Sequence, residues 1–345
     1  MSEIKNRIIT ISGEPASGKS TVIKRLKEEY EKQGYNVHIF SVGNEFRKMA
    51  QEKGLSIEEF NKFIVGREDI DRLIDSAVAQ RGKEINSKKR LSDIYIFDSR
   101  LAFHNIPNSF SIRLTVDDNV AGKRVFEDKK RGEEDKYSTL EDAIKATRAR
   151  KLNEVERYKN RYGIDLQDPN NYKLVIDTSF ANIEDIAQVI MQGLEYDMQD
   201  KFFGNMWTSP KKLLPLQDEL DTIYTGSCYN LNTLVDIIKK EGYDPTREIF
   251  TIEVDDRMYI IEGHHRNFAA GSLGKTLVPY LTIAKDDETM PIGFSVTARE
   301  RARSLTKTRL LGHEQFFDQP GKPFSYDEVY PGIKKELIQR EGVDR

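Results

Sequence analysis

The nine residues from Gly13 to Thr21 constrain this chain more than any other part of its sequence. They read Gly-Glu-Pro-Ala-Ser-Gly-Lys-Ser-Thr and follow a short apolar run, Ile8 to Ile11. Two glycines separated by four residues let the backbone turn so that successive N–H groups converge on an anion, at the start of a helix. The spacing therefore predicts a strand, a phosphate-binding loop and a helix in that order.

The side chains of this loop have separate expected roles. Lys19 would reach the β- and γ-phosphates of a nucleoside triphosphate, and the hydroxyl of Ser20 would be a ligand of Mg²⁺. ATP and Mg²⁺ are therefore the expected nucleotide and metal. The residues predicted to bind the nucleotide are Gly13, Ser17, Gly18, Lys19, Ser20 and Thr21.

Five short runs rich in β-branched residues alternate with longer helical patterns through the first two hundred residues. This alternation predicts an α/β fold with a parallel five-stranded sheet flanked by helices. One helix is expected over 140–162, ended by Gly163, and Ser56 with Glu59 indicates a capping box for another. The expected strands are Ile8–Ile11, Asn36–Phe40, Ile94–Phe97, Ser111–Thr115 and Leu174–Ile176.

Composition narrows the class of protein further. A length of 345 residues favours two domains, and a formal net charge of -3 argues against a protein that binds polyanions over its whole surface. The single cysteine, Cys228, can form neither an internal disulfide nor a thiolate metal site by itself. No apolar stretch approaches twenty residues and no signal segment is evident, so we expect a soluble, cytoplasmic protein without a membrane span.

The pattern changes near residue 200, where aromatics, glycine, proline and lysines follow one another without a clear period. Beyond it we expect a smaller α+β domain with a helix over 232–241, strands over 248–254, 258–262 and 278–283, and a helix over 267–273. Helical patterns at 298–311 and 332–340 follow. The predicted boundaries are 1–198 for the first domain, 199–210 for a linker, 211–290 for the second domain and 291–345 for a charged helical extension.

Several stretches of the first domain resemble archaeal-type cytidylate kinases, and they occur in one collinear series. They are Ser41–Arg47, Gly54–Asn61, Asp69–Arg72, Asp98–Ala102, Glu156–Lys159 and Tyr162–Asp165. The resemblance covers roughly the first 195 residues. It implies the fold of a P-loop nucleoside-monophosphate kinase, and an enzyme that transfers the γ-phosphate of ATP to a (d)CMP-type nucleotide.

The same resemblance implies roles for residues outside the loop. Arg47 and Arg100 would hold the acceptor's phosphate, and Ser41 would lie at the floor of the acceptor pocket. Arg150 and Arg157 lie seven residues apart on one helical face, with Glu154 between them, and would belong to a closing lid. Two further catalytic residues are predicted from their positions: Arg131 lies in a basic run, and Asp98, at the end of a strand, suits a base near the acceptor or a carboxylate that holds a ligand of Mg²⁺.

Two departures from the family pattern concern the acceptor. The usual Glu-Gly-Arg is Asp98-Ser99-Arg100 here, and residues 133–139 look like a local insertion. Three hypotheses therefore stay open. The chain is a cytidylate-like kinase, or a kinase of a modified nucleotide, nucleic acid or small hydroxyl compound presented by the second domain, or a nucleotide-gated DNA-binding or regulatory protein.

The second domain contains a segment, Glu262-Gly263-His264-His265-Arg266, that resembles the ParB/sulfiredoxin-like fold. The resemblance covers about residues 207–285 and implies a second phosphate site made by Arg266 and the backbone at Gly263 and His264, with Glu262 or His265 handling a proton or a metal. His264 stands where the reductases have their catalytic cysteine, which argues against sulfiredoxin activity. Adjacent histidines diverge, so a phosphate-binding or structural role is preferred to a metal site.

The basic run from Arg299 to Arg309 carries five cations without interleaved aromatics. A solvated helix is the default interpretation, and contact with nucleic acid stays open.

Overall fold

The computed structural model describes residues 6–42, 49, 51–55, 68–88, 90, 92–128, 137–214, 231–291 and 296–306. The chain divides into two compact units: unit 1 contains Met1–Ser179 and Ile186–Phe203, and unit 2 contains Phe180–Asp185 and Gly204–Arg345. The segment 199–210, which the sequence suggests as a linker, contributes the strand β6 (Met206–Thr208) to unit 2.

Unit 1 is built on the parallel sheet that the sequence predicts. Its strands lie in the order β2-β3-β1-β4-β5, and every neighbouring pair is parallel. β1, β3 and β4 are buried along nearly their whole length, as apolar strands covered on both faces should be. The strands are β1 (Arg7–Gly13), β2 (Asn36–Ser41), β3 (Asp93–Asp98), β4 (Phe110–Thr115) and β5 (Leu174–Asp177).

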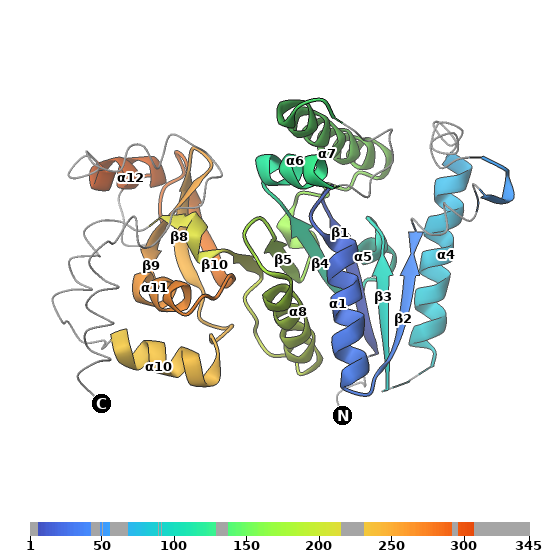
Figure 1. Cartoon of the computed structure of the whole chain (residues 1–345), viewed down its shortest axis with the longest axis horizontal. Coiled ribbons are helices and arrows are strands. Elements are labelled where there is room, and N and C mark those ends of the chain that lie inside the picture. The colour runs from blue at the N-terminus through green and yellow to red at the C-terminus, as the bar shows by residue number, and fades with distance from the viewer. Residues whose placement is uncertain are drawn as a thin grey trace. The chain divides into compact units, whose positions relative to one another are not determined.

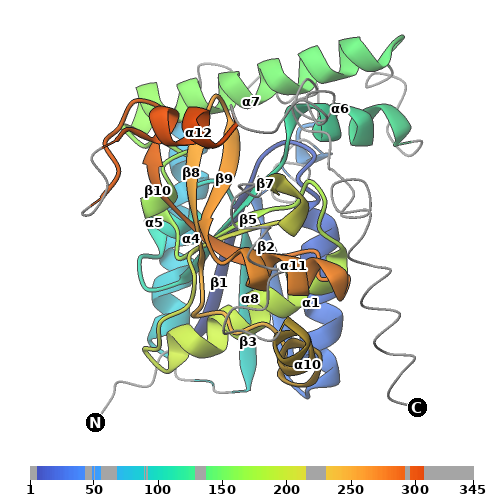
Figure 2. The same ribbon diagram turned by 90° about the vertical axis from the view of Figure 1, so that its left-hand side faces the viewer.

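Helices cover both faces of this sheet (Figures 1 and 2). α1 (Lys19–Lys32) and α8 (Ile183–Met198) lie on one face, and α4 (Glu68–Asn86) and the short α5 (Ala102–Asn105) lie on the other. Val78 and Ile85 of α4 pack with Ile8, Tyr95 and Phe97 of the strands. The alternation of side chains along each strand divides the apolar residues between the two helical layers.

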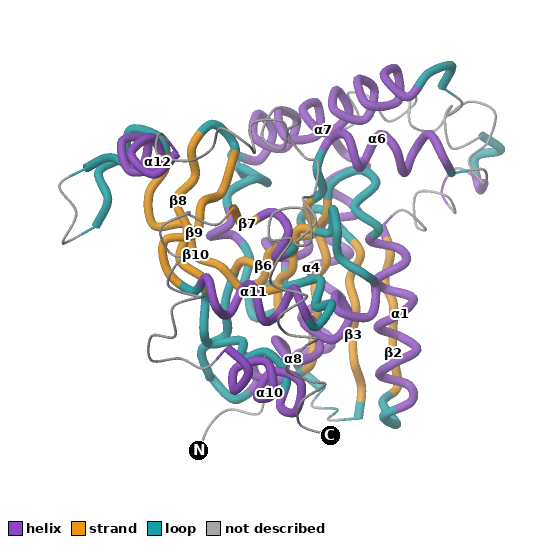
Figure 3. The backbone as a smooth tube through the Cα atoms, turned by 60° about the vertical axis from the view of Figure 1, so that its left-hand side comes forward, coloured by secondary structure: helices purple, strands orange, loops and turns teal. Residues whose placement is uncertain are grey.

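α6 (Asp118–Glu127) and α7 (Leu140–Tyr162) run alongside each other (Figure 3). Asp117 and Thr139 cap their first turns, and Gly163, with a φ of 68°, ends α7 as predicted. The two helices approach closely at Gly122, where an added Cβ would lie 2.6 Å from the Cα of Ile144. The predicted capping box at Ser56 and Glu59 lies outside the described residues.

Unit 2 contains a mixed sheet in the order β6-β10-β8-β9-β7. β10 runs antiparallel to β6 and parallel to β8, β8 and β9 form an antiparallel hairpin, and β7 is parallel to β9. Asp255 and Asp256 make the hairpin turn with positive φ angles of 50° and 60°. The strands not yet bounded are β7 (Leu213–Leu214), β8 (Ile249–Val254), β9 (Arg257–Glu262) and β10 (Val278–Lys285).

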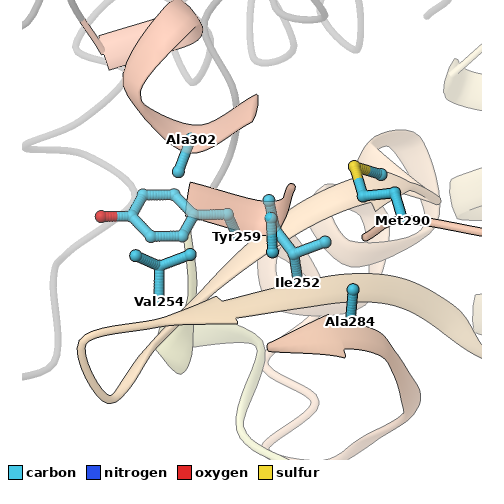
Figure 4. Close-up of a cluster of buried hydrophobic side chains, with 7 residues drawn as sticks. Ile252, Val254, Tyr259, Ala284, Met290 and Ala302 are labelled. Atoms are coloured by element: carbon cyan, nitrogen blue, oxygen red, sulfur yellow. The ribbon is translucent and has the colours of Figure 1, made fainter. Parts of the chain in front are cut away.

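Two helices of unit 2 cover opposite faces of this sheet. Ala270 of α11 (His264–Ser272) packs with Ile249 and Ile260, whereas Ala298 and Ala302 of α12 (Ala298–Thr306) pack with side chains that alternate to the other face. Figure 4 shows this second cluster, with Ile252, Val254 and Tyr259 beneath α12. The start of the predicted extension after residue 290 is therefore part of the core of unit 2, because α12 supplies small residues that let it approach the sheet.

In the described part of unit 2, α10 (Leu231–Glu241) agrees with the predicted helix over 232–241. α11 begins at His264, three residues earlier than the sequence suggests, because Gly263 adopts a φ of 101° and allows the chain to turn directly from β9 into the helix. Within the described ranges, no helix is long and apolar enough to cross a membrane.

Asp93 at the start of β3 is expected to support the stability of unit 1 in a pH-dependent way. Its carboxylate accepts hydrogen bonds from Asn36 (3.1 Å) and Tyr95 (3.1 Å), and hydrogen bonds led by that of Asn36 lower its pKa to about 2. Because the folded pKa lies below the ordinary value, this stabilisation is complete above about pH 4 and is lost as the pH falls through about 2. Asp93→Asn should lower the unfolding free energy at pH 7 by roughly 1–2 kcal/mol.

Urea denaturation at pH 7 and pH 2.5 measures this effect. The difference between Asp93→Asn and the wild type should shrink at the lower pH. Asp256→Asn, at an exposed turn of unit 2, is the control and should behave as the wild type does. Identical urea curves for Asp93→Asn and the wild type at pH 7 would contradict the prediction.

Candidate active site

The loop between β1 and α1 has a backbone shaped by two unusual residues. Gly18 has a φ of 83° and Ala16 a φ of 61°, and both angles lie in the left-handed region. At Gly13 an added Cβ would lie 2.7 Å from the Oγ of Ser17 and 3.3 Å from the carbonyl oxygen of Leu114, so only glycine fits. The loop curls tightly above the end of β1, and Gly18, Ser20 and Thr21 are exposed at the start of the helix.

Three side chains of unit 1 meet at the carboxyl edge of the sheet, beside this loop. The ammonium of Lys19 pairs with Oδ1 of Asp98, and the hydroxyl of Ser41 donates to Oδ2 of the same carboxylate over 3.1 Å. Ser41 ends β2 and Asp98 ends β3, and the two residues are register partners. Parallel strands place their carboxyl ends at one edge, so the structure brings together the loop lysine, the predicted catalytic Asp98 and Ser41, which was predicted for the acceptor pocket.

The next charged pair lies close enough to influence Lys19. Nε and Nη2 of Arg100 each lie 2.9 Å from Oε2 of Glu154, which belongs to α7. Burial, followed by the positive charge of Arg100, lowers the pKa of Lys19, while Asp98 and Glu154 act in the opposite direction. Lys19, Asp98, Arg100 and Glu154 therefore form one electrostatic cluster of two cations and two carboxylates.

Arg150 and Arg157 lie at the border of this cluster. Nε of Arg150 lies 3.4 Å from Oε1 of Glu154, and the Arg150 side chain is 62% exposed. Arg157 is exposed and donates to the hydroxyl of Tyr158 over 3.2 Å. Both arginines are thus on α7 near Glu154, as expected, and their catalytic role stays a prediction.

Two residues predicted for the same site, Arg47 and Arg131, lie outside the described residues. Their roles in holding the acceptor and in catalysis stay predictions.

Glu14, the second residue of the loop, anchors it to the body of unit 1, and sequence reasoning missed this. Its buried carboxylate accepts from Arg113 Nη2 over 2.9 Å and from the backbone N–H of Val116 over 3.1 Å. Nζ of Lys151, on α7, lies 3.2 Å from Oε2 of Glu14, the oxygen that accepts from Val116, and also 3.2 Å from Asp118. An acidic residue inside an anion-binding loop needs a cation beside it. The presence of Glu14 in the loop is therefore the one sequence signal that indicates a buried ion pair at this position.

The charged form of Lys151 is favoured by its two carboxylate partners. Burial alone would lower its pKa, but the carboxylates of Glu14 and Asp118 outweigh burial, so the pKa lies above its ordinary value. α7 carries many cations, and no local pattern distinguishes this lysine from the others.

Arg124 of α6 is a second residue that sequence reasoning missed. It donates to the backbone oxygen of Ala16 over 3.1 Å and to the hydroxyl of Thr178 over 3.2 Å. Thr178 in turn donates to the backbone oxygen of Ser17 over 3.0 Å. Arg124 therefore joins the outer side of the phosphate loop to the segment that follows β5.

The candidate phosphate site of unit 2 is arranged around an ion pair. Arg266 donates to both carboxylate oxygens of Glu262, over 2.7 and 2.5 Å, and to the backbone oxygen of Glu248 over 2.9 Å. His264 is buried, and burial followed by the charge of His265 lowers its pKa to about 3, so it is neutral at pH 7. The guanidinium of Arg266 is thus engaged by a carboxylate in this structure. In the part of the chain that is described, no group of three or more His, Cys, Asp or Glu side chains is arranged so that it could hold a metal ion.

The first cation of the C-terminal basic run has a structural role. Arg299 donates to Asp255 (2.8 Å), Asp286 (2.9 Å) and Asp287 (3.1 Å). It thereby ties two turns of unit 2 together instead of lying solvated on its helix. The reason is that both turns present carboxylates to one guanidinium. Lys307 and Arg309 lie outside the described residues.

Comparison with known proteins adds the following. The sequence profile of the cytidylate kinase-like family matches residues 8–180. A cytidylate kinase of Methanocella arvoryzae is 34% identical over 188 residues, which are 54% of this chain and 97% of that protein. An S-adenosylmethionine-dependent nucleotide dehydratase of Lacinutrix mariniflava is 35% identical over 188 residues, or 53% of this chain, and the match spans 35% of the dehydratase.

Among solved structures, shikimate kinase from Bacteroides thetaiotaomicron aligns with 55% of this chain and 98% of its own, at 10% identity and a TM-score of 0.36. The family profile ends at residue 180, so the part of unit 2 that begins at Gly204 lies beyond it.

Proposed function

We propose that this chain, which belongs to the cytidylate kinase-like family, transfers the γ-phosphoryl group of ATP to a pyrimidine nucleoside monophosphate of the (d)CMP type. The observation that carries the proposal is the cluster at the carboxyl edge of the unit 1 sheet. There Lys19 of the phosphate loop contacts Asp98, which also holds Ser41, and Arg100 is close enough to lower the pKa of Lys19. Donor-side and acceptor-side groups are thus within one charged cluster.

The phosphate loop suits a triphosphate donor with Mg²⁺. Its backbone turns at Ala16 and Gly18, so that N–H groups at the start of α1 can donate hydrogen bonds to phosphate oxygens. Lys19 adds a positive charge at the start of the same helix. The Ser20 hydroxyl is exposed in the first turn and would hold Mg²⁺. When bound, the metal neutralises charge on the β- and γ-phosphates.

The transfer needs positioning and positive charge more than acid–base chemistry. An oxygen of the acceptor's phosphate attacks the γ-phosphorus, the bond to the β–γ bridging oxygen breaks, and ADP leaves with that electron pair. The acceptor oxygen is already anionic, so no proton must be removed. Lys19 and Arg100 are suited to stabilise the charge on the transferring group, and Asp98 orients Lys19 and Ser41.

The acceptor follows from the family and from its relatives' names. The relative from Methanocella arvoryzae is named for cytidylate, and the relative from Lacinutrix mariniflava is named for a nucleotide. Because the match spans about a third of the dehydratase, the dehydration activity is not carried over to this chain. The change to Asp98-Ser99-Arg100 motivates testing deoxy and modified cytidylates alongside CMP.

An acceptor panel tests the proposal. ADP formation would be measured with CMP, dCMP, UMP, AMP and GMP at fixed ATP, and we expect cytidine acceptors to give the highest kcat/KM. Ser41→Ala should raise KM for the acceptor about 3–10-fold, as the loss of one hydrogen bond does, and leave KM for ATP unchanged. Ser87→Ala, at the exposed end of α4, is the matched control. Failure of every nucleoside monophosphate to accept a phosphoryl group would sink the proposal.

For unit 2 we propose a second phosphate-binding turn at Gly263–Arg266, on the basis of its resemblance to ParB/sulfiredoxin-like domains. The positive φ of Gly263, which leads directly into α11, and the nearly buried Arg266 support it. A phosphate would have to replace the carboxylate of Glu262 on Arg266. Equilibrium binding of CTP to Arg266→Met in a Lys19→Met background separates this turn from the unit 1 loop, and binding equal to that of Lys19→Met alone would exclude it.

A further inference from the structure

The fully buried residues of α7 lie only near its start. Of its 23 residues, all described in their backbone and burial, only Ala143 and Thr147 are buried. Both belong to its first eight residues, where α6 approaches closely at Gly122. Hydrophobic burial therefore fixes the first third of the helix. The position of the rest depends on the polar contacts that it makes.

In the middle of α7, the polar contacts of its partly buried side chains come from Lys151 and Glu154, which are three residues apart on one face of the helix. At the end of α7, the hydroxyl of Tyr162 donates to Asp75 over 2.8 Å. Lys151 reaches Glu14 and Asp118, and Glu154 reaches Arg100. The neighbouring Arg148 and Arg150 are 67% and 62% exposed, whereas Lys151 is 21% exposed. Lys151 is therefore the cation of this stretch that points into the body of unit 1.

Glu14 is a fixed anchor for such a contact. Its carboxylate is held by the buried guanidinium of Arg113 and by a backbone N–H, and its own backbone belongs to the phosphate loop. The ion pair with Glu14 consequently fixes the position of Lys151 relative to the phosphate loop. Through Glu154, the same helix then sets where Arg100 stands relative to Lys19.

We propose that Lys151 is a positioning residue that fastens α7 to the phosphate loop through Glu14, so that Arg100 and Arg150 are held at a working distance from Lys19. The proposal rests on the proposed kinase activity for its catalytic consequence. Its structural part, that Lys151 contributes to fixing the last two thirds of α7 together with Glu154 and Tyr162, holds independently of the reaction. Lys151 itself contacts carboxylates and is assigned no contact with substrate.

The test combines kinetics with amide hydrogen exchange on the full chain. Lys151→Met should lower kcat with ATP and CMP by about 10²-fold, as misplacement of a catalytic group by an ångström does, and change either KM less than threefold. Lys151→Arg, which keeps the charge, should restore kcat to within about tenfold of the wild type. In the nucleotide-free protein, exchange over residues 148–162 should be at least about tenfold faster in Lys151→Met, with 140–147 unchanged.

Lys145→Met, an exposed lysine on the same helix, is the matched control and should leave both readouts unchanged. Wild-type kcat in Lys151→Met would overturn the catalytic part, whatever the exchange shows. Unchanged exchange over 148–162 would overturn the structural part. If the wild type phosphorylates no nucleotide, the proposed function fails by that result, and hydrogen exchange alone then decides whether Lys151 fastens the helix.

Discussion

Replacing Lys19 with Met is expected to lower kcat/KM for nucleotide phosphorylation by about 10³-fold, which is the size of effect expected when a cation on a transferring phosphoryl group is lost. Lys19 is the loop residue whose ammonium reaches the carboxyl edge of the sheet, where it meets Asp98. Methionine has a similar length and no charge, so the change removes the charge with little change of volume. Lys19→Arg should not restore activity, because a planar guanidinium is wider than the ammonium that this nearly buried place accommodates.

Lys24→Met is the matched control for this prediction. Lys24 belongs to the same helix, and its side chain is 79% exposed with a partner at 4.0 Å. Coupled measurement of ADP formation should show no change for it, and thermal denaturation should confirm that both variants are folded. If Lys19→Met kept a tenth or more of the wild-type rate, the transfer would have to occur elsewhere. If the double variant Lys19→Met, Arg266→Met then lost this residual rate, the site of the transfer would be in unit 2.

Replacing Glu14 with Gln should lower the stability of unit 1 by about 3 kcal/mol, the lower end of the range for breaking a buried ion pair. Arg113 is 4% exposed, and in this variant its buried guanidinium would lose the negative charge of its carboxylate partner. Lys151 would lose one of its two carboxylate partners and keep Asp118. For a domain of about this size, the change corresponds to a fall in Tm of roughly 6–12 °C. Differential scanning calorimetry measures it directly.

Two further variants make this result interpretable. Glu31→Gln removes an exposed carboxylate of α1 that pairs with Lys27, and it should change the stability by less than about 0.5 kcal/mol. Combining Glu14→Gln with Arg113→Met removes the buried charge as well as its partner, so the double variant should be more stable than the sum of the single effects predicts. A Glu14→Gln protein that melts with the wild type would show that the pair contributes nothing to stability.

Local patterns predicted most of unit 1 correctly. The five strands and their parallel arrangement follow from β-branched runs that alternate with helical segments, because strands buried on both faces cannot carry an amphipathic pattern. α7 was predicted from 140 to 162 with Gly163 at its end, and the structure adds Thr139 as the cap of its first turn. In unit 2 the hairpin of β8 and β9 was recognisable from its two adjacent aspartates at the turn.

The packing of α12 was not predictable in the same way. Ala298 and Ala302 are ordinary helix residues, and only the position of the unit 2 sheet makes them part of a core. Arg299 beside them looked like one more cation of a basic run. Its three aspartate partners come from turns 12 to 44 residues away in the sequence. Contacts over such separations leave no local pattern, so composition and periodicity could not separate a structural arginine from a solvated one.

The sequence by itself determined the phosphate loop, because the spacing of Gly13, Gly18 and Lys19 is a property of neighbouring residues. It also placed Ser41 and Asp98 at strand ends, where parallel strands bring residues to one edge. Only the tertiary structure decided which charges meet that loop. The contact of Lys151 with Glu14 joins residues 137 positions apart, and many cations on α7 competed for that place in the sequence. Lys151 is distinguished from the other cations by its burial, and a side chain becomes buried only when the helix packs against the rest of unit 1.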